Sequence, residues 1–270
     1  MKISKLVFIG AGNMAEALIK GLIGQGVLPG SCITATDVRA ERLAEMETRF
    51  GILTSRDNRA AVADASVIVL AVKPQQMTDV LAELKASLPK TALVISIAAG
   101  KKCATFETAI GDGTHVIRVM PNTPALVGAG ASAICRGRWA TEDDLATAEK
   151  LLAAVGLVVR TEESMMDAVT ALSGSGPAYV FYLAEMMLEA AKRMGMDGAV
   201  ARQLTAATIC GAAKLIMSTS DAPSVLRDRV TSKGGTTAAA LAVMSERKVF
   251  DAVVDAVLAA EKRSKELSAT

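Results

Sequence analysis

The feature that most constrains the fold is a glycine motif near the start of the chain. An apolar run, LVFI at residues 6–9, leads into GAGNMA at residues 10–15, and a helical pattern follows. In a strand–turn–helix setting, a G-x-G-x-x-G/A motif predicts dinucleotide binding, with a plain βα turn as the alternative. Gly10 permits the tight turn, Gly12 lets the backbone approach a pyrophosphate, and Ala15 is small enough for close helix packing. The helix N-terminus offers N–H groups and a positive dipole end to the phosphates.

The first half of the chain alternates expected strands with expected helices. We expect strands at residues 3–9, 31–36, 67–71, 92–96, 115–119 and 131–135. Helices are expected between them at residues 14–25, 40–50, 59–63, 76–87, 102–109 and 142–155. The runs at 67–72 and 92–97 are continuously apolar, which is typical of fully buried parallel strands. This order predicts an α/β fold with a Rossmann-type parallel sheet covered on both faces.

The second half changes character, because strand signals vanish after about residue 160. Helices are expected at residues 177–194, 199–218, 223–230, 237–247 and 249–267. Residues 177–184 and much of 206–217 are apolar nearly all round, so such helices must be buried on all sides. A helical segment of ~100 residues has little interior of its own, which favours a subunit interface. We predict an NAD(P)-binding domain at residues 1–162 and an all-helical domain at 163–270 that forms an obligate homodimer.

Composition excludes several classes of protein. No apolar run approaches the ~18 residues of a membrane span. The net charge is +2 without a basic cluster, so no nucleic-acid partner is expected. Cys32, Cys103, Cys135 and Cys210 are far apart and show no C-x-x-C spacing. We therefore expect no metal site, no disulfide framework, no signal peptide and a cytoplasmic location.

The single histidine, His115, bears on the chemistry. It stands between Gly113-Thr114 and the apolar Val116-Ile117, so we expect it to start a strand rather than to act as a base. Histidine-based dehydrogenase chemistry is then disfavoured.

Residues after the second strand bear on cofactor choice. Ligands of an open α/β sheet bind beyond the carboxyl ends of its strands. Asp37 lies 25 residues beyond Gly12, roughly where an acidic residue bonds the adenosine ribose of NAD. Arg39 could hold a 2′-phosphate instead, or be a solvated residue of the first helical turn. The choice between NADH and NADPH stays open.

Two glycine-rich loops stand in the second half, SGSGP at residues 173–177 and TSKGGTT at 231–237. Each leads into an expected helix. Their hydroxyls and backbone N–H groups suit a small anion such as a carboxylate. Helix capping and close helix packing are the alternative for each loop.

The motifs together identify a family resemblance over residues 3–267. GAGNMA at 10–15, AVKP at 71–74, SIAAG at 96–100, RVMPNTP at 118–124, LSGSGPAY at 172–179 and TSKGGTT at 231–237 resemble pyrroline-5-carboxylate reductase. The resemblance implies an oxidoreductase of proline biosynthesis that acts on CH–NH donors, with NAD(P)H reducing the C=N bond of 1-pyrroline-5-carboxylate to L-proline. It also implies a helical domain intertwined with its twofold mate, an active site between the Rossmann domain of one subunit and the helical domain of the other, and rings of dimers in some members.

The resemblance assigns site residues by position. The glycine motif contributes Gly10, Ala11, Gly12, Asn13, Met14 and Ala15 to cofactor binding, beside Asp37 and Arg39. The family adds Asn58, Ala71, Val72, Lys73, Pro74, Ala98 and Ala99 on the cofactor side. Glu163, Gly235, Thr236 and Thr237 match substrate-side positions. Thr237 is the candidate catalytic residue, through a hydrogen bond to the ring nitrogen. NADPH is the expected cofactor, with NADH as the open alternative.

Two departures and two competing interpretations remain. Lys233 stands where many relatives have proline, and Arg229 where some have asparagine. A β-hydroxyacid or ketoacid dehydrogenase would use a helix-borne lysine, but Lys192 and Lys214 lie in no glycine-flanked motif. A non-catalytic NAD(P)-binding sensor would have no need of the two downstream glycine-rich loops together.

Overall fold

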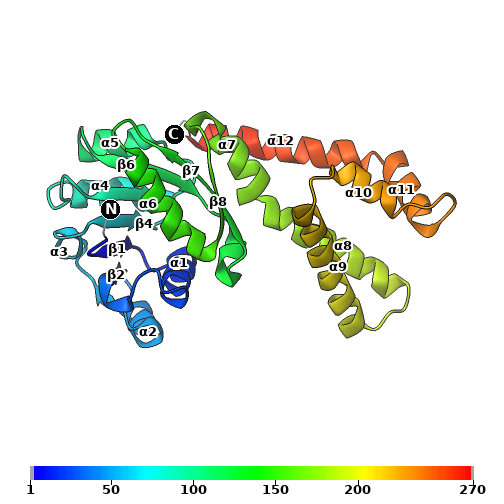
Figure 1. The fold of residues 1–270 in the computed structure, drawn as a ribbon, viewed down its shortest axis with the longest axis horizontal. Helices are drawn as coiled ribbons and strands as arrows, with labels where there is room; N and C mark the ends of the chain where they lie inside the picture. The colour runs from blue at the N-terminus through cyan, green and yellow to red at the C-terminus, as the bar shows by residue number, and fades with distance from the viewer. Residues whose placement is uncertain (1–2, 269–270) are drawn as a thin grey trace. The chain divides into compact units, whose positions relative to one another are not determined.

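The structure, a computed structural model, describes residues 3–268 of the chain and divides into two compact units (Figure 1). Unit 1 holds residues 3–175 and 260–268, and unit 2 holds Gly176–Ala259.

Unit 1 is built on an eight-stranded sheet of order β3-β2-β1-β4-β5-β6-β7-β8. Its strands are β1 (Leu6–Ile9), β2 (Ile33–Thr36), β3 (Leu53–Ser55), β4 (Val67–Leu70), β5 (Leu93–Ser96), β6 (His115–Met120), β7 (Gly130–Arg136) and β8 (Gly156–Arg160). All neighbouring pairs are parallel except β6 and β7. The Rossmann-type sheet predicted from the sequence is therefore present.

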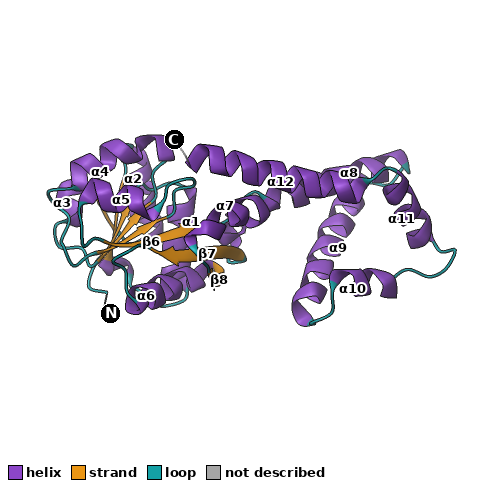
Figure 2. Cartoon of the chain, turned by 90° about the horizontal axis from the view of Figure 1, so that it is seen from above, coloured by secondary structure: helices purple, strands orange, loops and turns teal. Residues whose placement is uncertain are grey.

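The sheet has an apolar core on each face, which explains why the sequences of its central strands are continuously hydrophobic. In β1, Leu6 and Phe8 belong to the core on one face, and Val7 and Ile9 to the core on the other. Helices cover both faces of the sheet (Figure 2). They are α1 (Asn13–Gly24), α2 (Ala40–Phe50), α3 (Asn58–Val62), α4 (Met77–Leu84), α5 (Cys103–Ile110) and α6 (Glu142–Leu152).

Strand β7 departs from the expected parallel arrangement, since it runs antiparallel to β6. A parallel connection needs a crossover of about a dozen residues or more. Only the 3-10 segment Thr123–Val127 and its flanking residues lie between Met120 and Gly130, so the chain can return only in the antiparallel sense. Helix α6 then provides the crossover that makes β8 parallel to β7.

Two strands at the sheet edges escaped the sequence pattern. Strand β3 has only three residues, and β8 is largely exposed. Short edge strands carry little hydrophobic signal, because they lack the buried faces that make central strands apolar.

The end of unit 1 is helical. It contains α7 (Met166–Val169), which continues into a π-helical segment, Thr170–Gly174. The last turns of α12 (Val249–Ser268) belong to the same unit, where the hydroxyl of Ser264 donates to Asp167 Oδ1 at 2.6 Å. This hydrogen bond joins residues 97 positions apart.

Unit 2 consists of helices and their connections (Figure 2). Besides the first part of α12, it holds α8 (Gly176–Arg193), α9 (Gly198–Ser218), α10 (Pro223–Arg229) and α11 (Thr236–Glu246). The five helices predicted from the sequence for the second half are present. Large apolar side chains on them are open to solvent in the single chain, among them Tyr182 at 64% exposure and Phe250 at 80%. An apolar surface of this kind marks an interaction site.

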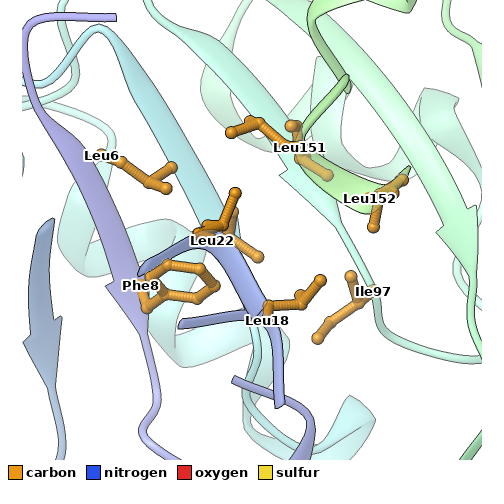
Figure 3. Close-up of a pocket in the computed structure, with 9 residues that line it drawn as sticks. Leu6, Phe8, Leu18, Leu22, Ile97, Leu151 and Leu152 are labelled. Carbon is orange, nitrogen blue, oxygen red and sulfur yellow. The ribbon is translucent and has the colours of Figure 1, made fainter. Parts of the chain in front are cut away.

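The core under α1 encloses a small cavity of about 10 Å³ (Figure 3). Leu18 and Leu22 of α1 line it together with Phe8 of β1, Ile97, Leu151 and Leu152, and Leu18 points toward Ile97. The lining is wholly apolar, and a space of this size holds no cofactor, so this cavity is a packing feature. Among the described residues, no helix combines the length and apolar character required to span a membrane.

Candidate functional site

The carboxyl ends of β1, β2, β3 and β4 surround a pocket of about 450 Å³ in unit 1. Its lining comes from four successive strand–loop junctions, as expected for an open α/β sheet. The predicted cofactor residues that line it are Gly10, Gly12, Asp37, Arg39, Asn58, Ala71, Val72 and Lys73.

Gly10 and Gly12 of the motif have different surroundings. Gly10 has φ +96°, and a Cβ atom there would lie 2.8 Å from the carbonyl oxygen of Ala71. The glycine thus lets the β1 and β4 loops approach each other. Among the described residues, no atom lies within 4 Å of a Cβ placed on Gly12, which leaves the open space that a pyrophosphate needs beside the backbone.

The other residues of the motif support this loop. Asn13 begins α1, Met14 is half-buried, and Ala15 is fully buried in the core between helix and sheet. Ala11 is also buried, and its N–H donates to Asp37 Oδ2 at 3.1 Å. The β2 carboxylate is therefore tied to the glycine loop.

Asp37 and Arg39 form a closed pair at the pocket. Arg39 Nε donates to Asp37 Oδ1 at 3.0 Å, and Nη2 donates to Oδ2 at 3.1 Å. Burial works to raise the pKa of Asp37, but the bonds from Arg39 and from the Ala11 N–H outweigh it and leave that pKa below its ordinary value. The carboxylate is thus held in its ionised form, and its negative charge is balanced by the Arg39 guanidinium.

Arg42 is a residue that the sequence reasoning missed. Its Nε donates to the carbonyl oxygen of Ala11 at 2.7 Å, and its guanidinium also pairs with Glu16 and Glu45. The hydrogen bond from Arg42 to the Ala11 carbonyl holds the backbone of the glycine loop in place. No local motif marks this arginine, because its partners lie up to 31 positions away.

Arg56 is a second missed residue, and it lines the pocket. It follows β3 directly. Ligands of an open α/β sheet bind beyond the carboxyl ends of its strands. The same rule would have selected Arg56 if β3, which has only three residues, had been predicted from the sequence.

Asn58 has both of its amide atoms engaged. Its Oδ1 accepts from the Thr36 hydroxyl at 2.6 Å, and its Nδ2 donates to Glu83 Oε2 at 2.9 Å. The side chain therefore joins the end of β2 to α4 and holds one wall of the pocket.

The remaining predicted cofactor residues lie beyond this pocket. Pro74 and Ala99 line a second hollow of about 410 Å³ in unit 1, with Thr170, Ser175 and Leu267 among its other walls. Ala98 is buried, and its N–H donates to Ser96 Oγ at 3.3 Å.

Glu163 lies in an internal polar cluster of unit 1. Its Oε1 accepts from the Cys103 N–H at 2.7 Å and lies 3.3 Å from Nη1 of the buried Arg118. Cys103, Cys135 and Glu163 bring their possible ligand atoms within 4.8 Å of one another, a proximity that sequence spacing does not reveal. A hydrogen bond with Cys135 and burial raise the pKa of the Cys103 thiol, so it stays protonated. The absence of a metal at this cluster remains a prediction.

The SGSGP segment is not the open loop expected from its glycines. Residues 170–174 form a π-helical segment that precedes α8, and the Ser175 N–H donates to the Thr170 carbonyl at 2.8 Å. The backbone here is engaged in helical bonds rather than free for an anion. The Asn122 side chain lies 3.3 Å from the carbonyl and the hydroxyl oxygens of Ser173, so the PNTP loop positions this segment.

The TSKGGTT segment of unit 2 does form a loop before a helix. Gly234 has φ +71°, and Gly235 is the N-cap of α11. The Gly235 N–H already donates to the Ser232 carbonyl at 3.0 Å, so it is not a free donor here. Thr236 and Thr237 are the first residues of the helix, and N–H groups at these positions have no acceptor within it. Arg229 pairs with Asp221 rather than standing free.

His115 begins β6, as predicted. Its Nδ1 lies 2.7 Å from Asp144 Oδ2, at the N-terminus of α6. The histidine therefore has a structural partner.

Comparisons with known proteins now give the family. A family model described as pyrroline-5-carboxylate reductase dimerisation matches residues 163–267, and one described as NADP oxidoreductase, coenzyme F420-dependent, matches residues 5–100. A pyrroline-5-carboxylate reductase of Methanosarcina acetivorans is 44% identical over 99% of both chains. The chain belongs to the pyrroline-5-carboxylate reductase family.

Solved structures of the family agree over the whole length. The pyrroline-5-carboxylate reductase of Coxiella burnetii is 39% identical and covers 100% of both chains with a TM-score of 0.92. The pyrroline carboxylate reductase of Plasmodium falciparum, solved with NADP bound, is 28% identical, covers 98% of both chains and has a TM-score of 0.89. The family resemblance predicted from the motifs is confirmed.

Proposed function

We propose that this protein reduces the C=N bond of 1-pyrroline-5-carboxylate to L-proline with NADPH, NADH being the alternative cofactor. The observation that carries the proposal is the pocket at residues 10–12, 37–39 and 71–73, within a chain that matches reductases of this name from end to end. The open space at Gly12 suits the pyrophosphate of a dinucleotide, and the cationic Lys73 and Arg56 line the same pocket.

The main requirement of the hydride transfer is that the protein holds the nicotinamide close to the imine carbon of the substrate. The reduced nicotinamide supplies a hydride to the imine carbon. Because an iminium carbon is already electrophilic, neither a strong base nor a metal is required. Holding two reactants in a near-attack geometry can contribute several kcal/mol, up to about 7–11 kcal/mol in favourable cases.

The substrate side of the proposal rests on the start of α11. The N–H groups of Thr236 and Thr237 would bind the substrate carboxylate at a positive helix end. The Thr237 hydroxyl would bond the ring nitrogen and steady its proton. Glu163 belongs to unit 1, where its carboxylate accepts from the Cys103 N–H, and any contact with the substrate would come from that unit. Gly235 contributes by close packing before the helix, since its N–H is engaged by the Ser232 carbonyl and a Cβ at this position would collide with Ser232.

We infer a homodimer through residues 163–267, with rings of dimers as a further state, and a cytoplasmic location. The dimerisation family match and the exposed apolar side chains of unit 2 support the dimer. The Rossmann side and the substrate side would then come from different subunits.

The first test is Thr237→Ala. We expect kcat/KM for pyrroline-5-carboxylate to fall by about 10- to 100-fold, as for the loss of one hydrogen bond to a charged group. The Kd for NADPH should stay near the wild-type value, because the hydroxyl serves the substrate only. Thr231→Ala is a matched control, since its hydroxyl donates to the Arg227 carbonyl at 2.7 Å. Unchanged kinetics for Thr237→Ala would remove the threonine from the mechanism.

NADPH oxidation with pyrroline-5-carboxylate separates the competing interpretations. Turnover supports the reductase. Cofactor binding without turnover would favour a non-catalytic NAD(P)-binding protein. Turnover with a 2-keto or 3-hydroxy acid instead would favour the related dehydrogenases.

A further inference from the structure

Two arginines line the pocket at the ends of β2 and β3, and they differ in what surrounds them. Parallel pairing of β2 with β3 sets Thr36 opposite Ser55. The residues that follow these two strands, Asp37 and Arg56, therefore leave the same edge of the sheet and line the same pocket. Arg39 lies on this rim two residues after Asp37.

Arg39 has its guanidinium fork occupied. Two of its nitrogens bind the two oxygens of Asp37, at 3.0 and 3.1 Å. The pKa of Arg39 is raised by its hydrogen bond to Asp37 and by the charge of that carboxylate. A phosphate would have to compete with this bidentate pair for the same donors.

Arg56 is in the opposite situation. Its side chain is exposed, and within residues 3–268 its guanidinium makes no hydrogen bond or ion pair. All of its donors are available to a ligand in the pocket, at little cost in broken protein contacts. A bidentate guanidinium is the side-chain group best matched to a phosphate.

Resting on the proposed function, we propose that Arg56 is the residue that selects the 2′-phosphate of NADPH. Arg39 contributes indirectly, by neutralising the Asp37 carboxylate that would otherwise repel a phosphate group carrying about −1.5 to −2 charges. Asp37 remains the acceptor for the ribose hydroxyl of NADH. The pair Asp37–Arg39 therefore makes the site tolerant of both cofactors, and Arg56 sets the preference.

The test measures the binding of NADP⁺ and NAD⁺ to the full chain by calorimetry, without substrate. For Arg56→Ala we expect the Kd of NADP⁺ to rise by about 10- to 100-fold, with the Kd of NAD⁺ nearly unchanged, because one charge-assisted contact is lost. Arg59→Ala is the matched control. This arginine lies three residues further along, is exposed, lines no part of the pocket, and its Nε donates to the Glu83 carbonyl at 3.2 Å.

A double-mutant cycle separates the roles of the two arginines. Arg39→Ala should weaken NADP⁺ binding when Asp37 is present, because the carboxylate is then uncompensated. The same substitution in an Asp37→Asn background should cost much less. If Arg39→Ala costs the same in both backgrounds while Arg56→Ala has no effect, Arg39 is the phosphate ligand and the proposal is overturned.

One further outcome is decisive. Equal loss of NADP⁺ and NAD⁺ on Arg56→Ala would make Arg56 a general attractor of anions and would also overturn the proposal. Since binding is measured without pyrroline-5-carboxylate, a failure of the reductase activity would leave this test intact. Steady-state kcat/KM with NADPH and NADH should follow the same ratios where the enzyme turns over.

Discussion

At the scale of single residues, the two glycines of the loop at residues 10–15 serve different purposes. Gly10 is required by the protein itself, since its positive φ and the nearby Ala71 carbonyl exclude a side chain. Gly12 is not required by the fold, because a Cβ there meets no atom of residues 3–268 within 4 Å. The two glycines therefore separate folding from ligand binding within one motif.

This difference predicts opposite outcomes for two alanine substitutions. Gly10→Ala should lower the free energy of unfolding by about 1–3 kcal/mol, through backbone strain and the clash with Ala71. Gly12→Ala should leave stability within about 0.5 kcal/mol of wild type, yet raise the Kd for NADPH because its Cβ enters the pyrophosphate space. Urea unfolding and cofactor titration of both variants check this. A Gly12→Ala protein with normal cofactor affinity would contradict the placement.

At the scale of secondary-structure elements, α6 shows how one terminus links helix, strand and histidine. Thr141 and Asp144 form a capping box, and Asp144 Oδ2 also lies 2.7 Å from His115 Nδ1 at the start of β6. Burial works to raise the pKa of Asp144, but bonds from Thr141 and His115 outweigh it and leave the pKa below its ordinary value.

The lowered pKa of Asp144 predicts a pH-dependent contribution to stability. The folded protein binds this proton less tightly than the unfolded chain, so the contribution is complete above about pH 4–5 and is lost as pH falls through the folded-state pKa. Asp144→Asn should cost about 1–2 kcal/mol at pH 7 and progressively less toward pH 3. Asp143→Asn, at an exposed position in the same turn, is the control. A cost that does not change with pH would contradict this account.

At the scale of the whole molecule, unit 2 cannot bury its own apolar surface. Side chains such as Phe181 at 61%, Met217 at 82% and Phe250 at 80% exposure lie open in the single chain. Unit 1, by contrast, buries both faces of its sheet with its own helices. The two halves therefore depend on association to different degrees.

We therefore predict that stability depends on protein concentration. The midpoint of thermal unfolding should rise as the concentration is raised, because association favours the folded state by mass action. Phe250→Asp should shift the molecular mass in solution toward the monomer. Val38→Asp, at an exposed position of unit 1, is the control and should not. A wild-type protein that sediments as a monomer at micromolar concentration would contradict the dimer.

Much of the fold could be predicted from local sequence, because central strands and long helices have strong hydrophobic patterns. Helix α2 has the predicted bounds, and His115 starts a strand as its neighbours indicated. What the sequence missed is non-local. Strand β3 is too short to be recognised, and its omission concealed Arg56. The partners of Arg42 lie far along the chain.

The sequence by itself determined the alternation of strands and helices, the glycine loop and the family, because each is written in contiguous residues. Only the tertiary structure decided that the Gly235 N–H is engaged, that residues 170–174 are helical, and that Arg39 is paired with Asp37 while Arg56 has no hydrogen-bond or ion-pair partner within residues 3–268. The physical reason is that hydrogen-bond donors are limited. Which donors remain for a ligand depends on every neighbour that the fold brings near, and no local pattern records those neighbours.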